Sequence, residues 1–257
     1  MSRETEVAPA PIGDAATVVL LRDSVDGPEV LLLERPRHRG SVAGAWVFPG
    51  GGVDPGDRLP TDAAVPAGDA GAPLEAAATA AAVARDDVVD QLAARRAAVR
   101  EVREETGLAV SPDAPVATAL WVPPRSAPKR LRTWFYLTAA PHGPSVLAED
   151  EVIDYAWLRP EAALERHASA SLTLVAPTWV TLHGMQGHGS VAEIMAVARQ
   201  RGVTHYETRL GASERGPVLF WAGDIAYDDD ALAERAGGRH RLEIGQVPWV
   251  YSTSGLS

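Results

Sequence analysis

The stretch that decides the fold is Arg100-Glu101-Val102-Arg103-Glu104-Glu105-Thr106-Gly107-Leu108. Side chains three and four positions apart share one face of a helix, so Glu101 is expected beside both Glu104 and Glu105. Like charges at this spacing destabilise a helix by roughly 0.2–0.5 kcal/mol per pair. Such a cluster therefore either forms a solvated surface or holds a cation. Carboxylate oxygens are the ligands that magnesium prefers, commonly alongside substrate phosphates.

A long helix is predicted to carry this stretch. Residues 74–106 are rich in alanine, which has the highest helix propensity. Gly107 follows, and glycine readily adopts the left-handed conformation found just past a helix end. Val99 and Val102 lie on a different flank from the acidic cluster and are expected to face the core.

A second informative stretch lies upstream, at Phe48-Pro49-Gly50-Gly51-Gly52-Val53-Asp54-Pro55-Gly56-Asp57. It reads as the end of a strand followed by a tight turn. Arg-Glu-apolar-x-Glu-Glu-x-Gly-apolar is the core of the Nudix box, which also requires Gly-x5-Glu upstream. Gly51 followed five residues later by Asp57 supplies that element in altered form. The chain is thus identified as a member of the Nudix hydrolase superfamily.

The resemblance implies an α/β fold, the Nudix α/β/α sandwich with a mixed sheet. It also implies an enzyme that uses Mg²⁺ or Mn²⁺ to cleave a diphosphate bond. The implied metal ligands are Glu101, Glu104, Glu105, Asp57 and a backbone carbonyl at Gly50 or Gly51. The implied catalytic set is Glu101, Glu104, Arg100 and Glu151.

Within that set, Arg100 pairs with a carboxylate in the family and fixes its orientation. Glu101 is the first choice for the general base that takes a proton from the attacking water. Related enzymes recruit the base from a later loop, and the acidic run 149–151 is the obvious source here. A solvated acidic turn is the alternative reading of that run.

Two departures from the box matter. Asp57 stands where the family has glutamate, so its carboxylate is one methylene shorter. The family places seven residues between that acid and the arginine, whereas 42 residues (58–99) intervene here, an insertion of 35. A loop of this length is tolerable because closure entropy grows only logarithmically with length. The roles of Asp57 and of the insertion are therefore open at this point.

The insertion, together with 31–35, 44–51 and 175–178, resembles the branch that includes the peroxisomal coenzyme A diphosphatase. Members of that branch tend to carry Arg-Phe-Asp-Thr before the central strand, where this chain has Arg130-Leu131-Arg132-Thr133. Coenzyme A or acyl-CoA is the first substrate hypothesis. ADP-ribose, NADH and dinucleoside polyphosphates carry the same diphosphate, and a catalytically weak ligand-binding protein is the rival class.

Basic residues near these segments are candidates for substrate binding. The candidates are Arg35, Arg125, Arg130 and Arg132, with Lys129, Arg37, His38 and Arg39 close by. Arginine presents a bidentate fork that suits phosphate. A solvated basic loop is the alternative for the residues between 123 and 132, which are predicted to form a loop.

Short apolar runs predict the remaining elements. Strands are expected at 15–22, 30–35, 45–48, 116–122, 133–138, 155–158, 218–222 and around 249–251, and helices at 160–167, 177–183 and 191–201. The expected organisation is a Nudix domain at 12–188, with the insertion at about 58–92, and a C-terminal α/β extension at 189–257 that packs on the core. That extension is expected to be either a dimer surface or a lid.

Composition limits the class further. A net charge of −10 disfavours a nucleic-acid surface, because phosphate neutralisation supplies most of such affinity, and capped RNA is accordingly disfavoured. The absence of cysteine excludes disulfides and thiolate nucleophiles. No apolar run reaches the roughly 18 residues of a membrane span. We expect a cytoplasmic protein that acts on a small-molecule nucleotide, with a homodimer as the expected assembly if one forms.

Overall fold

The structure is a computed structural model that describes residues 10–36, 43–59, 74–141, 143 and 152–254, and for 74–86 it describes the backbone alone. Several predicted site residues lie outside the described residues. These are Arg37, His38, Arg39 and the acidic run that includes Glu151. Their predicted roles therefore stay predictions.

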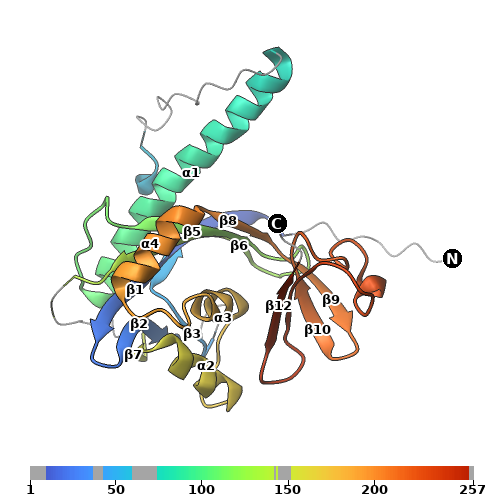
Figure 1. Ribbon diagram of the computed structural model, residues 1–257. Helices are drawn as coiled ribbons and strands as arrows, with labels where there is room; N and C mark the ends of the chain where they lie inside the picture. The colour runs from blue at the N-terminus through green and yellow to red at the C-terminus, as the bar shows by residue number, and fades with distance from the viewer. Residues whose placement is uncertain (1–9, 37–42, 60–73, 142, 144–151, 255–257) are drawn as a thin grey trace.

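The centre of the fold is an eight-stranded mixed sheet (Figure 1). Its strands are β1 (Ile12–Ser24), β2 (Gly27–Glu34), β3 (Trp46–Val47), β4 (Gly50–Gly52), β5 (Val116–Val122), β6 (Arg130–Ala139), β7 (Asp154–Leu158) and β8 (Thr204–Glu207). The main order is β3-β2-β1-β6-β5-β8, and β4 pairs with β1 while β7 pairs with β2. The β1–β6 and β5–β8 pairs are parallel and the others are antiparallel.

Helices cover both faces of this sheet. They are α1 (Leu74–Thr106), α2 (Pro160–Ala168), α3 (Ala176–His183) and α4 (Val191–Arg201). Strand β1 shows the alternation that separates the two faces: Val18 and Leu20 pack in the core with α1, whereas Val19 and Leu21 pack in the core with α2, α3 and α4. This is the expected α/β/α sandwich with a mixed sheet, and the predicted fold class is confirmed.

The long helix α1 has the predicted bounds, and so does α4. Gly107 has φ +70°, and its N–H donates to the Arg103 carbonyl at 3.0 Å, which is how a glycine ends a helix. Figure 1 shows that the N-terminal half of α1 extends beyond the sheet and projects from the body of the molecule. The C-terminal half, with Val102 and Ala98, packs on the sheet.

A second, four-stranded antiparallel sheet follows β8, with the order β12-β11-β10-β9. Its strands are β9 (Arg209–Ser213), β10 (Gly216–Phe220), β11 (Arg239–Glu243) and β12 (Val250–Ser254), and a short 3-10 helix at Asp230–Leu232 lies beside β9. Leu242 and Trp221 belong to the same core cluster as α3 and β5. The second sheet therefore packs against the first.

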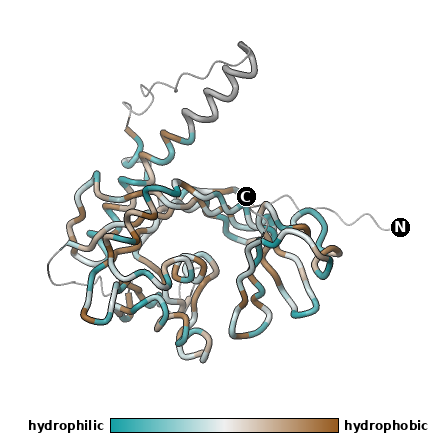
Figure 2. The backbone as a smooth tube through the Cα atoms, viewed as in Figure 1, coloured by the Kyte–Doolittle hydropathy of each residue, from teal (hydrophilic) through white to brown (hydrophobic). Residues whose placement is uncertain are grey.

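Two expectations about secondary structure are wrong. The residues 123–132 are not all loop, because β6 begins at Arg130. Only two strands were expected after residue 202, whereas five are present, β8 to β12. Four of the five residues of Arg239–Glu243 are histidine or charged, so this strand contains no apolar run that the sequence could reveal. Figure 2 shows short brown and teal segments mixed along the second sheet rather than long brown runs.

The described part of the chain contains no helix that is long and apolar enough to span a membrane. The domain boundary expected at residue 188 stays a prediction. Strand β8 extends the first sheet, pairing Tyr206 with Trp121 of β5, and the second sheet begins at Arg209.

Candidate active site

The glycine run 50–52 forms β4, which lies between β1 and the end of α1. A Cβ atom at Gly50 would lie 2.3 Å from the Ala16 carbonyl oxygen, and the residue has φ +157°. A Cβ atom at Gly51 would lie 2.3 Å from Glu101 Oε1. Only glycine allows both approaches, so the backbone of β4 touches the acidic face of α1 directly.

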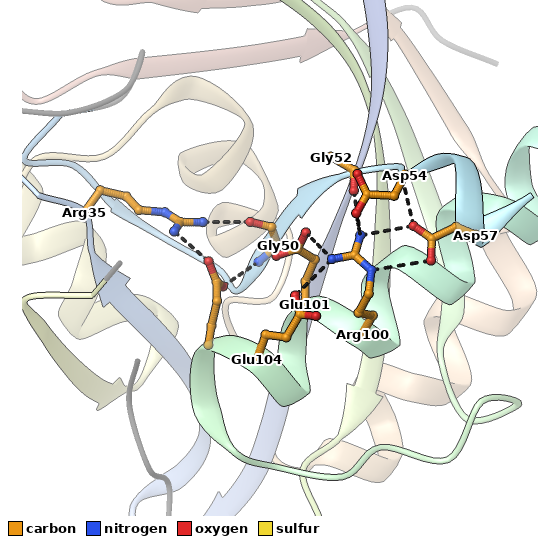
Figure 3. A network of polar contacts seen from close by, with 9 residues as sticks. Arg35, Gly50, Gly52, Asp54, Asp57, Arg100, Glu101 and Glu104 are labelled. Atoms are coloured by element: carbon orange, nitrogen blue, oxygen red, sulfur yellow. Dashed lines mark hydrogen bonds and ion pairs between the residues drawn. The ribbon is translucent and has the colours of Figure 1, made fainter. Parts of the chain in front are cut away.

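Glu105 is buried against this backbone, with 1% of its surface exposed. Its Oε2 accepts the Gly50 N–H at 2.9 Å. Its Oε1 forms an ion pair with Arg35 Nη1 at 2.6 Å, but the angles of this contact are not those of a hydrogen bond. Arg35 Nη2 also donates to the Gly50 carbonyl at 2.7 Å. Burial raises the pKa of Glu105 to about 7, although Arg35 and the Gly50 N–H act in the opposite direction. Figure 3 shows Arg35 reaching the glycine run from β2.

Arg100 is the centre of a second network (Figure 3). Its Nη1 donates to Glu101 Oε1 and to Glu104 Oε2, each at 2.9 Å. Its Nη2 donates to the Gly52 carbonyl at 2.9 Å and to Asp57 Oδ2 at 3.0 Å. The hydrogen bond that Arg100 donates to Asp57, together with the one that it donates to Glu101, raises the pKa of Arg100 despite partial burial. One guanidinium thus binds three of the predicted metal ligands, Glu101, Glu104 and Asp57.

Asp57 is 7% exposed and ends the short 3-10 helix Pro55–Asp57. Its Oδ2 accepts the Asp54 N–H at 2.9 Å, and its backbone carbonyl accepts a hydrogen bond from Arg96 at 3.0 Å. The side chain of Asp57 is shorter than glutamate, but it reaches Arg100 because the 3-10 turn brings the Asp57 backbone close to Arg100. The carboxylate is engaged by Arg100, so this geometry favours a positioning role for Asp57, and its predicted role as a metal ligand stays a prediction.

Four charged side chains close the base of the inserted segment. Arg58 binds Asp90 of α1 and Asp14 of β1, each at 2.6 Å. Arg132 of β6 binds Asp14 at 2.8 Å and also binds Asp90. Arg58 follows Asp57 directly, so these pairs hold the start of the insertion against α1. Arg132, which stands where the coenzyme A diphosphatase branch tends to have aspartate, thus contributes to this network.

A cavity of about 860 Å³ opens beside the acidic turn. Glu101, Glu105 and residues 50–52 line one part of it. The other lining residues are Ala15, Ala16, Thr17, Arg35, Pro36, Val47, Phe48, Trp121 to Pro124, Ala127 to Lys129, Leu131, Thr133, Phe135, Val175 to Thr178, Thr208 and Leu219. This volume is within the range of small-molecule sites.

The alternation of β6 decides which basic residues reach the cavity. Leu131, Thr133 and Phe135 line it, whereas Arg130 and Arg132 point to the opposite face of the sheet. Arg130 instead donates to the Ala10 carbonyl at 3.3 Å. Arg125 is exposed and is not among the lining residues. Residues 123–132 were predicted to form a loop, so the alternation of side chains along a strand was not considered for Arg130 and Arg132.

The chemistry of the donor set fits a divalent cation, because carboxylates and backbone carbonyls meet at one end of the cavity. Glu101 and Glu105 line the cavity, and Glu104 is more exposed. Among the described residues, however, no three ligating side chains are grouped around a single point. Glu101 and Glu104 face Arg100 here, so a metal ion would compete with the guanidinium for their oxygens.

Comparison with known proteins defines the class. The NUDIX domain model matches residues 11–65 and 88–176. These ranges cover more than half of the chain, and the gap between them falls inside the insertion. The chain belongs to the Nudix family, and its predicted class, a Nudix hydrolase, is confirmed.

The chain is also similar to solved structures, the first of which supports the fold. A NUDIX hydrolase from Alicyclobacillus acidocaldarius is 21% identical, with a TM-score of 0.58, and the match covers 73% of this chain and 96% of that one. A MutT NUDIX hydrolase from Burkholderia pseudomallei is 18% identical, with a TM-score of 0.44 and coverage of 69% and 100%. A C. elegans Ap4A hydrolase is 19% identical, with a TM-score of 0.40 and coverage of 72% and 99%. No curated protein matches the sequence significantly.

Replacing Gly51 by alanine is expected to lower kcat by about 10- to 100-fold, because a misplacement of about 1 Å costs that much in a well-aligned site. The new Cβ would lie 2.3 Å from Glu101 Oε1 and 2.4 Å from its Cδ, so the carboxylate must rotate away. Gly52→Ala is the matched control, since its Cβ would meet nothing within 4 Å. Steady-state kinetics and thermal unfolding check the result. Equal activity in the two variants would contradict it.

Proposed function

We propose that the protein is a divalent-metal-dependent hydrolase that cleaves the diphosphate bond of a nucleoside diphosphate linked to another group. The observation that carries the proposal is the contact of the acidic turn of α1 with the glycine run 50–52 at the wall of a substrate-sized cavity. Nudix hydrolases generally use divalent metals such as Mg²⁺ and act on small-molecule nucleotides.

Glu101, Glu104 and Glu105 are the residues proposed to hold the metal, with the Gly50 carbonyl as a further ligand. When bound, the ion neutralises the diphosphate and lowers the pKa of a water that attacks phosphorus. Asp57 holds Arg100, and Arg100 orients Glu101 and Glu104. Glu101 is the proposed general base, and Glu151 is the alternative.

The substrate phosphates require cations that the metal does not supply. Two of the described lining residues are positively charged, Arg35 and Lys129. Arg35 is engaged by Glu105, whereas Lys129 lies on the exposed loop that leads into β6. We therefore assign substrate phosphate contacts to Lys129 first. Arg125, Arg130 and Arg132 lie outside the lining, and their predicted contacts with substrate have no support from the cavity.

Coenzyme A or an acyl-CoA is the first substrate candidate, on the resemblance to the coenzyme A diphosphatase branch. Arg132 stands where that branch tends to have aspartate. This difference argues only indirectly against coenzyme A, because Arg132 binds Asp14 and Asp90 away from the cavity. ADP-ribose, NADH and dinucleoside polyphosphates are the alternatives. A cytoplasmic location and a homodimer remain predictions.

A substrate panel tests the proposal. The purified chain is incubated with coenzyme A, ADP-ribose, NADH and diadenosine tetraphosphate, with Mg²⁺, with Mn²⁺ and with excess EDTA, and the products are separated chromatographically. We expect two phosphate-bearing products from at least one substrate, with no product in EDTA. Binding without turnover across the panel would favour the rival view of a ligand-binding protein.

A further inference from the structure

The second sheet supplies part of the catalytic cavity. Thr208, which precedes β9, and Leu219 of β10 both line the cavity. Glu101 and Glu105 line the same cavity. Neither residue was singled out by the sequence motifs. Within β10, Val218 and Phe220 are buried in the separate core of the second sheet, whereas Leu219 packs toward the first sheet. The strand alternation therefore directs Leu219 to the cavity.

An aromatic floor, made of Phe48, Phe135 and Trp121, leads from the glycine run toward this part of the cavity. All three rings line the cavity. Phe48 precedes the glycine run by one residue and meets Phe135 edge-on, with ring centroids 6.4 Å apart. Phe135 meets Trp121 at 6.1 Å. The floor thus joins the acidic turn to the residues contributed by the second sheet.

The far end of the floor is held firmly. The Trp121 ring stacks on Tyr206 of β8, with centroids 3.9 Å apart and planes 3° apart. The Thr208 N–H donates to the Val122 carbonyl at 2.9 Å, and Trp221 Nε1 donates to Thr208 Oγ1 at 3.0 Å. Thr208 is 8% exposed. These bonds tie the second sheet to the end of β5, so the wall is part of the folded cavity.

The lining of the cavity combines a few charged residues with many apolar ones. The charged lining residues are Glu101, Glu105, Arg35 and Lys129. The lining residues next to Thr208 are apolar: the Val122 carbonyl accepts the Thr208 N–H, and Trp121 precedes Val122. A ligand with a charged diphosphate at one end and a flat, mainly apolar group at the other matches this arrangement. Aromatic rings bind flat rings well because their faces stack.

We propose that the second sheet determines substrate selectivity, with Leu219 as the wall that holds a planar group of nucleobase size against the aromatic floor. The inference rests on the proposed function, which places the diphosphate at the acidic turn. It goes further in assigning part of the recognition of the base to residues outside the Nudix-matched ranges. Leu219 and Thr208 lie beyond residue 176, where that match ends.

Calorimetric binding with Mg²⁺ present tests the inference without requiring turnover. The ligands are AMP and ribose 5-phosphate, which differ by the base. Wild type is expected to bind AMP at least ten times more tightly than ribose 5-phosphate. Leu219→Trp, which fills the space beside the floor, is expected to reduce AMP affinity at least tenfold and to change ribose 5-phosphate affinity by less than twofold.

Leu210→Trp is the matched control, because Leu210 is the cross-strand partner of Leu219 and is 53% exposed outside the cavity lining. It should bind both ligands as wild type does. Leu219→Ala covers the case in which the tryptophan variant does not fold, and it should weaken AMP alone by three- to tenfold. Equal binding of AMP and ribose 5-phosphate by wild type, or an equal loss of both in the Leu219 variants, overturns the inference. A wild type that binds selectively but cleaves nothing in the panel would instead contradict the proposed function.

Discussion

Glu101→Gln is expected to lower kcat by about 1000-fold or more on the best substrate of the panel. The substitution keeps the shape of the side chain but removes its charge, and with it a metal ligand and the first-choice base. A loss of three orders of magnitude corresponds to about 4 kcal/mol of transition-state stabilisation, a magnitude expected where metal ions stabilise developing charge. Glu101 touches the glycine run and faces the cavity.

Two measurements separate the roles of Glu101. Mn²⁺ titration reports on metal affinity, and the pH profile of kcat reports on the base. Weaker Mn²⁺ binding identifies a ligand, whereas unchanged binding with a large loss of kcat identifies the base. Glu165→Gln is the control, because Glu165 is exposed on α2 away from the acidic turn. Activity within tenfold of wild type in Glu101→Gln would remove the residue from the catalytic site.

Asp224→Ala is expected to destabilise the second sheet by about 3–5 kcal/mol, because it leaves the charge of Arg241 buried and unpaired. The two side chains are 0% and 4% exposed. Arg241 donates from Nε to Asp224 Oδ2 at 2.7 Å and from Nη2 to Oδ1 at 2.6 Å. Asp224 also accepts the backbone N–H groups of His240 and Ala226, each at 2.8 Å.

Urea unfolding followed by tryptophan fluorescence measures this effect, since Trp221 lies beside Asp224 in the second sheet. Asp228→Ala is the control, because the Asp228 side chain is 83% exposed. Adding Arg241→Met to Asp224→Ala should recover much of the loss, since replacing a buried pair by apolar groups is often neutral. An unchanged midpoint in Asp224→Ala would show that the pair does not support the sheet.

The same pair has a pH dependence. Burial acts to raise the pKa of Asp224, but the hydrogen bonds from Arg241 and from the two backbone N–H groups outweigh it and lower the pKa below its ordinary value of 3.8. A lowered folded-state pKa means that the carboxylate contributes stability above the unfolded-state value and loses it as the pH falls below about 3.8. This part of the acid sensitivity should be missing from the Asp224 variant.

The local elements of the site could be predicted from the sequence because they depend on neighbours in the chain. The helix spacing of Glu101, Glu104 and Glu105 and the stop at Gly107 are properties of a few consecutive residues. The bounds of α1 and α4 were predicted for the same reason. The family followed from the same residues, since the Nudix box is a local pattern.

Contacts between distant segments were decided by the tertiary structure. Arg35 lies 70 residues before Glu105, and only the packing of β2 beside the glycine run brings the two together. Asp57 reaches Arg100 across the insertion because a 3-10 turn and the Arg58–Asp90 pair close its base. Arg130 and Arg132 were assigned to the substrate because the loop was predicted to continue to residue 132. Once β6 starts at Arg130, the alternation of the strand turns both away from the cavity.

The sequence alone therefore determined the chemistry of the acidic turn, because helix geometry sets which carboxylates share a face. It did not determine what surrounds that turn. The second sheet is built from short strands with charged or exposed positions, and each is stable only when its neighbours supply the hydrogen bonds and the buried face. Leu219 and Thr208 reach the cavity beside the acidic turn through that long-range pairing. The identity of the cavity wall is for this reason a property of the folded chain.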